Sequence, residues 1–473
     1  MKKIYMTMLA AAALCTPPMS LFAETEVPST EGKEVLKIYD EVIFFDGYNT
    51  LEGISDESKA MIPEDDGILR HRTSLYSIRL TDEQLSRIGK ELTMLVEIGA
   101  LCDNYDRIGN INLAFVPKGA ETYNPDEVQR IEIGRFITPF MNKNYEPSTV
   151  PYVFEADYLS LILRDSKLRA DHDIWAEFEL FGIPYAANTQ VKGCADRQDV
   201  FTGTLTFITN PEPAPAVDND VIVPVVIKKP EYIGKNFNNY SEEATDELGK
   251  TIKTWTFEVP EDVTDAQIVF ITSNHGANTL GEEYKRRNHF VYYDEELMMT
   301  YKPGRTSCEP FRMYNTQGNG IYGTNEMTDK AWQSFSNWCP GDKIDNRILH
   351  LGEVKAGTHA FKISVPDAKF IGSQGDFPVS IFFQGVTSGT IAGEAAVNAV
   401  KPDFRSSIKV EADKVTVTSD TPVQEILLYD VAANLLAIEF DSNVLSLSDA
   451  PRGVLVLMVE YADGLTENYK IIR

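Results

Sequence analysis

The sequence lacks several motifs on which common protein functions depend. No Cys-x-x-Cys pair occurs among its five cysteines, and their wide spacing argues against a structural zinc site. Neither Gly-x-Ser-x-Gly nor Gly-x-x-x-x-Gly-Lys is present, so serine-hydrolase and nucleotide-binding functions have no support. Beyond the N-terminal region, no apolar run approaches the ~18 residues typical of a transmembrane helix.

Positive charge is also scarce. Lys and Arg number 44 against 71 Asp and Glu, a net charge of −27, which argues against a nucleic-acid partner. Long amphipathic helical repeats are absent, whereas 21 Tyr and 24 Phe favour strands. The 473 residues suggest about three domains. Composition therefore predicts a β-rich protein of several domains.

The N-terminus has the pattern of an export signal. Two lysines precede the apolar run 6–14, and Ala23 offers a small residue for cleavage, which together predict a signal peptide over 1–23. The run is too short to anchor the protein in a bilayer. Cys15 raises a lipoprotein alternative, but Leu14 stands where such signals usually have a small residue. We expect a protein that is secreted, periplasmic or on the cell surface.

Strand patterns divide most of the chain into two units. Alternating apolar runs that predict strands occur at 42–45, 92–96, 111–115, 221–227 and 381–383. Thr81 is expected to cap one helical turn. The Pro-rich segment 211–220 predicts a stiff, extended linker between a unit at 35–210 and a second unit at 221–391.

A third unit is expected at 398–473. Its strand-like runs occur at 408–412, 414–418, 426–430, 453–460 and 469–473, which predicts a small β-sandwich. Together with the turn at 450–454, this pattern resembles the C-terminal sorting domains of secreted Bacteroidetes proteins. The alternative is an accessory β-domain without a sorting role.

Four cysteines remain after removal of the predicted signal peptide. They are Cys102, Cys194, Cys308 and Cys339. An even number in an oxidising compartment is compatible with two disulfides, and four cysteines allow three pairings. The residues alone leave these pairings open.

Four sequence blocks together resemble one enzyme family. Residues 101–107 read Leu-Cys-Asp-Asn-Tyr-Asp-Arg, and residues 134–140 read Gly-Arg-Phe-Ile-Thr-Pro-Phe. Further on, 281–289 and the Trp-Cys-Pro-Gly block 338–341 follow in order. Across roughly 36–391, this arrangement resembles the peptide:N-glycosidase F family, the amidases that cut N-glycans from asparagine.

The resemblance implies an all-β fold with two jelly-roll β-sandwich domains side by side, followed here by the small C-terminal β-sandwich. It implies a monomeric enzyme that acts on N-glycosylated proteins or peptides and requires no metal or other cofactor. It also implies a Cys308–Cys339 disulfide, because the family bridges the segment leading to Trp-Cys-Pro-Gly. Cys102 lacks the family's usual upstream partner, so it either pairs with Cys194 or stays a thiol.

Asp106 matches the family's catalytic aspartate, four residues after Cys102. Hydrolysis of a glycosylated asparagine amide needs a carboxylate that accepts a proton from water, a contribution of ~10²–10⁴-fold. Arg107 could orient the peptide carbonyl or hold Asp106 through a fork-like contact. The structural alternatives are an ordinary turn aspartate and a surface ion pair.

Glu283 matches the family glutamate that precedes an aromatic residue and contacts the sugar beside the scissile bond. Alternate strand residues share a face, so a regular strand would place Arg287 and His289 beside Glu283 as supports. Glu282 would then point away from the site, and we expect it to be a solvated rim charge.

The third family acid is a glutamate two residues before a tryptophan. Asp173 and Trp175 occupy this pattern, with a shorter acid than the family has. Trp175 is either an apolar surface for N-acetylglucosamine or a core residue. In the second-domain loop, His275 stands where the family has a tryptophan. It is a candidate to hydrogen-bond sugar hydroxyls, with an ordinary turn residue as the alternative. An arginine expected before Trp-Cys-Pro-Gly is absent. These departures predict an altered specificity surface.

The sequence therefore predicts a metal-independent amidase that releases intact N-glycans. A non-catalytic N-glycan-binding lectin or adhesin on the same fold is the main alternative, since fold does not fix function. It would be favoured if Asp106 and Glu283 failed to meet at one site. A glycosidase with two carboxylates ~5–10 Å apart has no independent motif in its favour.

Overall fold

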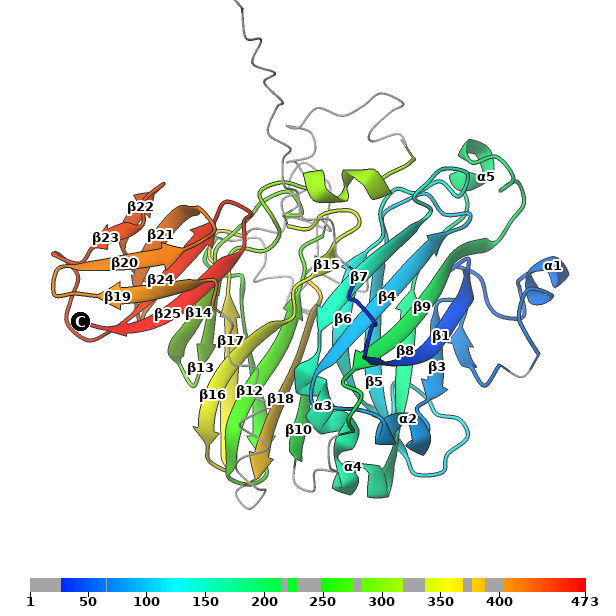
Figure 1. The fold of residues 1–473 in the computed structure, drawn as a ribbon, viewed down its shortest axis with the longest axis horizontal. Helices are drawn as coiled ribbons and strands as arrows, with labels where there is room; N and C mark the ends of the chain where they lie inside the picture. The colour runs from blue at the N-terminus through cyan, green and yellow to red at the C-terminus, as the bar shows by residue number, and fades with distance from the viewer. Residues whose placement is uncertain are drawn as a thin grey trace, which may run out of the picture.

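The computed structural model describes residues 27–64, 66–213, 220–227, 248–275, 282–317, 337–368, 377–387 and 404–473. The predicted signal peptide, Cys15 and most of the Pro-rich linker lie outside these ranges. The described chain is predominantly β and forms three groups of antiparallel strands, coloured blue to green, green to yellow and orange to red in Figure 1. The all-β prediction is confirmed.

The first group is a sandwich of two sheets. One sheet contains, in spatial order, β1 (Glu34–Phe45), β9 (Asp199–Thr209), β4 (Leu92–Ala100) and β7 (Thr149–Glu155). The other contains β6 (Gln129–Ile137), β5 (Ile108–Pro117), β8 (His172–Leu180), β3 (Leu75–Arg79) and β2 (Leu69–Arg72). We call this group the first sandwich.

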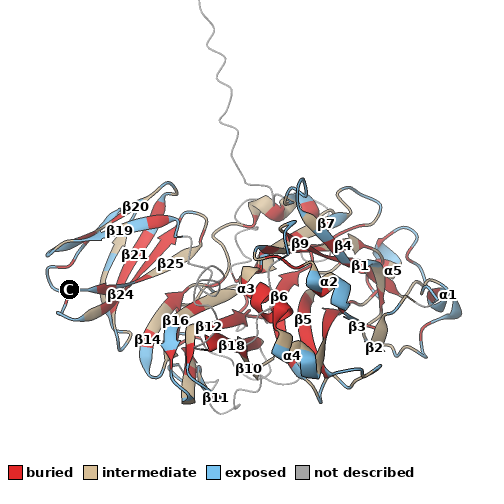
Figure 2. Ribbon diagram, turned by 60° about the horizontal axis from the view of Figure 1, so that its bottom comes forward, coloured by how far each residue is buried: buried red, intermediate tan, exposed pale blue. Residues whose placement is uncertain are grey.

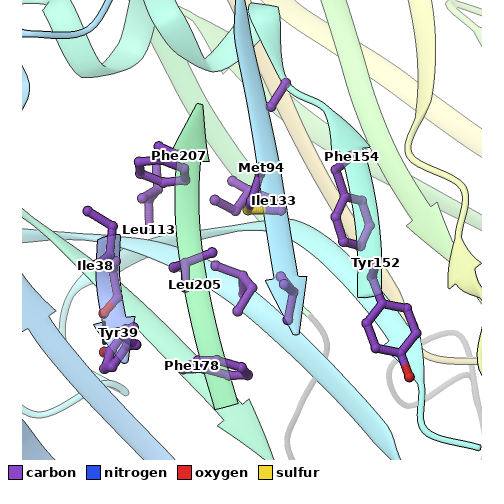
Figure 3. Close-up of a cluster of buried hydrophobic side chains, with 14 of the residues drawn as sticks. Ile38, Tyr39, Met94, Leu113, Ile133, Tyr152, Phe154, Phe178, Leu205 and Phe207 are labelled. Carbon is purple, nitrogen blue, oxygen red and sulfur yellow. Dashed lines mark hydrogen bonds between the residues drawn. The ribbon is translucent and has the colours of Figure 1, made fainter. Parts of the chain in front are cut away.

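Inward-facing side chains of these two sheets form one core. Met94 from β4, Leu205 and Phe207 from β9, and Leu113 from β5 all lie in it, each at most 1% exposed (Figure 3). In β4, residues of alternating character place one face inside, as the sequence run predicted. Burying each such side chain contributes about 1.5–3 kcal/mol relative to exposure.

Short helices join the strands of the first sandwich. They are α1 (Asp56–Lys59), α2 (Asp82–Ser86), α3 (Asp157–Arg164), α4 (Ser166–Asp171) and α5 (Ala187–Gln190). The predicted cap is present: the Thr81 hydroxyl accepts from the Gln84 amide, and the Gln84 side chain accepts from the Thr81 amide.

The second group is another two-sheet sandwich, which we call the second sandwich. One sheet contains β10 (Asp220–Val226), β18 (Val379–Thr387), β12 (Val263–Thr272) and β16 (Arg347–Val354). The other contains β11 (Ile252–Val259), β17 (Gly357–Ser364), β13 (His289–Tyr293) and β14 (Glu296–Tyr301). The jelly-roll connectivity and exact domain boundaries stay predictions.

The first and second sandwiches pack directly on each other. Strands β6, β12 and β18 are buried along most of their length on both faces (Figure 2). Arg135 on β6 is fully buried: it pairs with Glu132 at 2.7 Å and donates to the Ser273 hydroxyl and the Pro378 carbonyl of the second sandwich. β15 (Lys343–Ile344) also crosses over and pairs with β6.

The third group is a smaller sandwich at the C-terminus, which we call the third sandwich. Its sheets contain β19 (Ser406–Val410), β20 (Lys414–Ser419) and β23 (Val444–Ser446), and β22 (Leu435–Phe440), β21 (Val423–Asp430), β24 (Val454–Tyr461) and β25 (Thr466–Ile472). It packs against β13 and β14 (Figure 1) through one apolar cluster: Phe290, Leu297, Leu427, Tyr429, Val456 and Met458.

Two disulfides are present, and both join buried cysteines. Cys308–Cys339 forms as the family resemblance implied, with an S–S distance of 2.01 Å, and Cys102 pairs with Cys194. The 3-10 helix η1 (Glu309–Tyr314) begins directly after Cys308. Within the described ranges, no helix is long and apolar enough to span a membrane.

Candidate active site

The segment carrying Asp106 is a structured turn between β4 and β5. Cys102 anchors its start through the disulfide to Cys194. The buried carboxylate of Asp103 accepts from the backbone amides of Ile183, at 2.6 Å, and Tyr105, at 3.0 Å. Because a carboxylate bonded in this way fixes the backbone around it, the position of Asp106 is set by its neighbours.

Arg107 supports this turn through a contact with Asp103. Its Nε donates to one Asp103 oxygen at 2.6 Å, and its Nη2 contacts the other at 3.3 Å. The guanidinium therefore makes a fork-like contact with Asp103. Burial raises the pKa of Asp103, while Arg107 opposes that effect. The same guanidinium lies 5.2 Å from the ring centre of Tyr105.

Asp106 and Glu283 meet at one site although they come from different sandwiches. Burial raises the pKa of Asp106 to about 8, with a further increase from the nearby charge of Glu283 and an opposing effect of Arg107. Glu283 is only 8% exposed. A carboxyl group with a pKa displaced this far, next to a second acid, is typical of a catalytic site.

Glu283 lies on an irregular segment, 282–288, that leads into β13. The Asn337 side chain holds it by donating from Nδ2 to the backbone carbonyls of both Glu282 and Glu283. Asn337 directly precedes Trp338 and Cys339, so the Cys308–Cys339 disulfide fixes its surroundings. The predicted Trp-Cys-Pro-Gly block thus positions the backbone of the second acid.

The predicted arrangement of residues around Glu283 is wrong in two respects. Glu282 is 1% exposed and pairs with Arg287 at 2.8 Å, so it is not a solvated rim charge and Arg287 does not support Glu283. His289 is fully buried; its Nδ1 contacts the Arg287 carbonyl at 2.9 Å, and its ring stacks on Tyr301. The physical reason is that β13 begins only at His289, so strand alternation does not apply before it.

Burial also governs the ionisation of His289. Removal from water lowers the pKa of the imidazole to about 3, which keeps the ring neutral. It is therefore a core residue of the second sandwich and cannot contact substrate in this conformation.

Asp173 and Trp175 lie away from Asp106. The β5–β8 register pairs Val116 with Asp173 but Gly109 with Leu180, so Asp173 is at the end of β8 opposite to Asp106. At ~3.3 Å per residue, about 25 Å separates the two ends. Asp173 instead binds Lys118 at 2.8 Å and the Gly119 amide at 2.9 Å.

Trp175 is a core residue and not a sugar-binding surface. It is 5% exposed and packs with Ala114 and Val116, covered by Tyr123, whose ring makes an edge contact at 5.5 Å. It therefore offers no surface to a sugar, and the motif Asp173-x-Trp175 does not form part of the site.

Sequence reasoning missed Glu179. It shares the face of β8 with Asp173 but lies at the end beside Asp106, opposite Asn110 on β5. It is 7% exposed and pairs with Arg72 at 2.5 Å. The signal was present, because Glu179 stands two residues before the aromatic Phe181. The stronger match to tryptophan obscured it.

Two tyrosines beside Asp106 were also missed. Tyr105 and Tyr185 stack with ring centres 6.4 Å apart, and Tyr185 is 63% exposed. An aromatic pair with one exposed ring, next to a carboxyl group, can contact the apolar face of a sugar ring. No pattern in the sequence brings these residues together, because the chain between them includes four strands.

His275 lies near the site but is largely buried. Its Nε2 contacts the Ser273 hydroxyl at 2.8 Å, and its ring centre is 5.9 Å from that of Trp338. At 6% exposure it has little surface for substrate. Among the residues described, no group of three or more His, Cys, Asp or Glu side chains could hold a metal ion.

These features define an all-β protein whose paired acids lie where two sandwiches meet. The sequence model described as Peptide-N-glycosidase F, N terminal matches residues 36–194. The companion model, Peptide-N-glycosidase F, C terminal, matches residues 239–384. Together they cover more than half of the chain. The chain belongs to the peptide-N-glycosidase F family.

The solved structure of PNGF-II has a similar fold. The chain is similar to PNGF-II at 18% identity with a TM-score of 0.53, over 76% of this chain and 66% of that one. It therefore spans just under two thirds of the PNGF-II structure. PNGase F, a glycosylasparaginase from Flavobacterium meningosepticum, is similar at 14% identity with a TM-score of 0.45, over 75% and 96%. No curated protein sequence matches the chain.

Proposed function

We propose that this protein is a peptide-N4-(N-acetyl-β-glucosaminyl)asparagine amidase that releases intact N-glycans from glycoproteins or glycopeptides. The observation that carries the proposal is the meeting of Asp106 and Glu283 at one site. Membership of the peptide-N-glycosidase F family supports the reaction class. A purely glycan-binding protein would not need a carboxyl group whose pKa is raised to about 8.

In the proposed reaction, a water oxygen attacks the side-chain carbonyl carbon of the glycosylated asparagine. Asp106 accepts a proton from that water, the C–N bond breaks, and the proton is returned to the departing nitrogen. The products are an aspartate and a glycosylamine. A carboxylate with a pKa of about 8 is a stronger base than an ordinary aspartate, so it accepts this proton more readily.

The remaining side chains have binding and supporting roles in the proposal. Glu283 accepts hydrogen bonds from the sugar next to the scissile bond, and Glu179 replaces Asp173 as the third acid. Tyr105 and Tyr185 provide the aromatic surface for a sugar ring. Arg107 keeps the Asp103 turn in place. The mechanism assigns no step to a metal or cofactor.

Location and partners follow from the same proposal. We propose that the protein is exported, that cleavage after Ala23 removes the signal peptide, and that it acts as a monomer on N-glycosylated substrates outside the cytoplasm. Family membership supports this assignment, since N-glycans are substrates found on exported proteins.

The test is glycan release from a denatured high-mannose glycoprotein in heavy-oxygen water. We expect mass spectrometry to find asparagine converted to labelled aspartate with the wild type, and no conversion with Asp106→Asn. Asp173→Asn is the matched control, since its carboxyl group lies at the opposite end of β8, and it should retain activity. Retained glycan binding without release from any of several glycan classes would instead support the lectin.

A further inference from the structure

The segment 282–288 depends on contacts outside its own sandwich. It contains no strand, so no ladder of backbone hydrogen bonds holds it. Some of its contacts come from the third sandwich, residues 404–473. Both family models end before this region, the second of them at residue 384. The proposed reaction uses no residue of the third sandwich.

Arg286, three residues after Glu283, joins this segment to the third sandwich. Its Nη1 donates to a Glu460 oxygen at 2.6 Å and its Nη2 to the Gly464 carbonyl at 2.8 Å. Its Nε donates to the Pro303 carbonyl at 3.0 Å, within the second sandwich. The guanidinium is thus fixed from three directions, which defines its orientation as well as its position.

The acceptor of this contact is itself held firmly. Glu460 is 3% exposed and also receives the Lys302 ammonium at 3.0 Å, and Lys302 bonds Glu425 at 2.5 Å. Burial alone would raise the pKa of Glu460, but Arg286 and Lys302 lower it, so the carboxylate stays ionised. A buried, fully paired acid of this kind fixes geometry because moving either partner leaves a charge without compensation.

Two further contacts keep the sandwiches close beside the segment. Asn288 reaches the Tyr429 hydroxyl at 3.4 Å. Gly464 has a φ of +86°, and a Cβ there would lie 2.5 Å from the Thr306 amide nitrogen. Only glycine permits this approach of the 461–464 turn to the backbone that leads into Cys308.

We propose that the third sandwich is a positioning element of the active site, in which Arg286 holds the Glu283 segment in register with Asp106. The inference rests on the proposed amidase function for its catalytic consequence. It assigns to residues 404–473 a role in catalysis that the resemblance to sorting domains does not include. Arg286 is a positioning residue, since it acts through Glu283 and not on substrate.

The test compares Arg286→Gln with Lys470→Gln in the full-length protein. Lys470 pairs with Glu296 across the same interface but is 48% exposed and does not contact the segment, so it is the matched control. We expect amide hydrogen exchange in 282–288 to become roughly tenfold faster in Arg286→Gln and to stay at the wild-type rate in Lys470→Gln. Arg286→Lys keeps a positive charge beside Glu460. Its exchange rate in 282–288 should lie between those of the wild type and Arg286→Gln.

Catalytic measurements give a second reading. Arg286→Gln should lower kcat by roughly tenfold, with a smaller change in KM, because misplacing a group costs most in the transition state. Carbon-13 NMR of the Asp106 carboxyl should show its pKa moving down as Glu283 becomes less fixed. Arg107 and Asp103, two other charged groups that act on Asp106, are unchanged in this variant.

The outcomes separate this inference from the proposed function. If the wild type shows no amidase activity, exchange and NMR still report whether Arg286 positions the segment. Wild-type exchange and an unchanged Asp106 titration in folded Arg286→Gln would overturn the inference. If Arg286→Gln does not fold, Arg286→Lys and Gly464→Ala replace it, and wild-type exchange in both would have the same consequence.

Discussion

Asp106 and Glu283 lie close enough across the junction of two sandwiches for the charge of one to act on the other. Burial, and then Glu283, raises the pKa of Asp106 to about 8. Neither acid belongs to a regular strand: each follows or precedes one on a turn held by hydrogen bonds. The site therefore depends on two turns being held relative to each other by the packing of separate sandwiches.

Replacing Asp106 should stabilise the fold while removing activity. The raised pKa means that the folded state binds a proton more tightly than the unfolded state, so stability falls as pH rises from about 4 to about 8. Asparagine does not ionise, so the stability of Asp106→Asn does not fall in this way as the pH rises. We expect its free energy of unfolding to exceed that of the wild type by about 1 kcal/mol or more at pH 8, and by much less at pH 4. Urea unfolding at both values measures the difference.

The pH dependence of catalysis should follow the same pair of acids. For the wild type, kcat/KM should rise with pH, reach half of its maximum near pH 8 as Asp106 ionises, and level off about one pH unit higher. In Glu283→Gln the residual activity should level off at lower pH, because one cause of the raised pKa is gone. A pH profile of kcat/KM that does not move in Glu283→Gln would contradict the electrostatic effect of Glu283 on Asp106. Because the two acids titrate together, the apparent pKa values belong to the pair and not to either residue.

Glu179→Gln and Asp173→Asn form a matched test on one strand. Both remove a carboxylate from the same face of β8, but only Glu179 lies at the end beside Asp106. We expect kcat/KM to fall by about 10-fold or more in Glu179→Gln, as for loss of a positioned polar contact, and to stay near the wild-type value in Asp173→Asn. The reverse result would restore the assignment based on Asp173-x-Trp175.

The Cys308–Cys339 disulfide should support both stability and the site. It links residues separated by 31 positions, and its removal in Cys308→Ser/Cys339→Ser should cost about 3–4 kcal/mol. Because Asn337 holds the Glu283 backbone, kcat should fall as well. The Cys102→Ser/Cys194→Ser variant has a longer loop, of 92 positions, and should lose at least as much stability. Denaturant melts and kcat under non-reducing conditions provide the comparison.

Arg107 should be worth much more than a surface arginine. Arg107→Gln leaves the buried Asp103 carboxylate without its charged partner, and we expect a cost of about 3 kcal/mol in the free energy of unfolding. Arg405→Gln removes an ion pair with Asp463 whose side chains are 39% and 41% exposed, and should cost at most about 0.5 kcal/mol. Equal effects in thermal melts would show that Asp103 is neutral in the fold.

The strands could be predicted from the sequence because each depends on local alternation. Runs such as 92–96 and 111–115 lie inside β4 and β5, and the five runs of the third sandwich all fall on or beside its strands. The Thr81 cap was readable for the same reason, since its partners are within three residues. Partners across the sandwiches, such as Arg135 with Ser273, have no local signal.

The site was only partly predictable, and each miss has a physical cause. Asp106 and Glu283 came from ordered sequence blocks, and the structure brings them together. Asp173 and Glu179 share one face of β8, so alternation could not tell which end of the strand reaches the site. Assigning His289 to the site assumed a strand that begins too late to include Glu283.

The two residues of β15 have a consequence for how the chain matures. Lys343 and Ile344 pair with Phe136 and Arg135 at one end of the outer edge of β6, which is synthesised long before them. An N-terminal fragment ending in the Pro-rich linker would expose that edge, and an uncovered strand edge invites pairing with other chains. A nascent chain meets the same hazard until its later half emerges. The outer edge of β6 is therefore paired at Arg135 and Phe136 only after the second half of the chain has been synthesised.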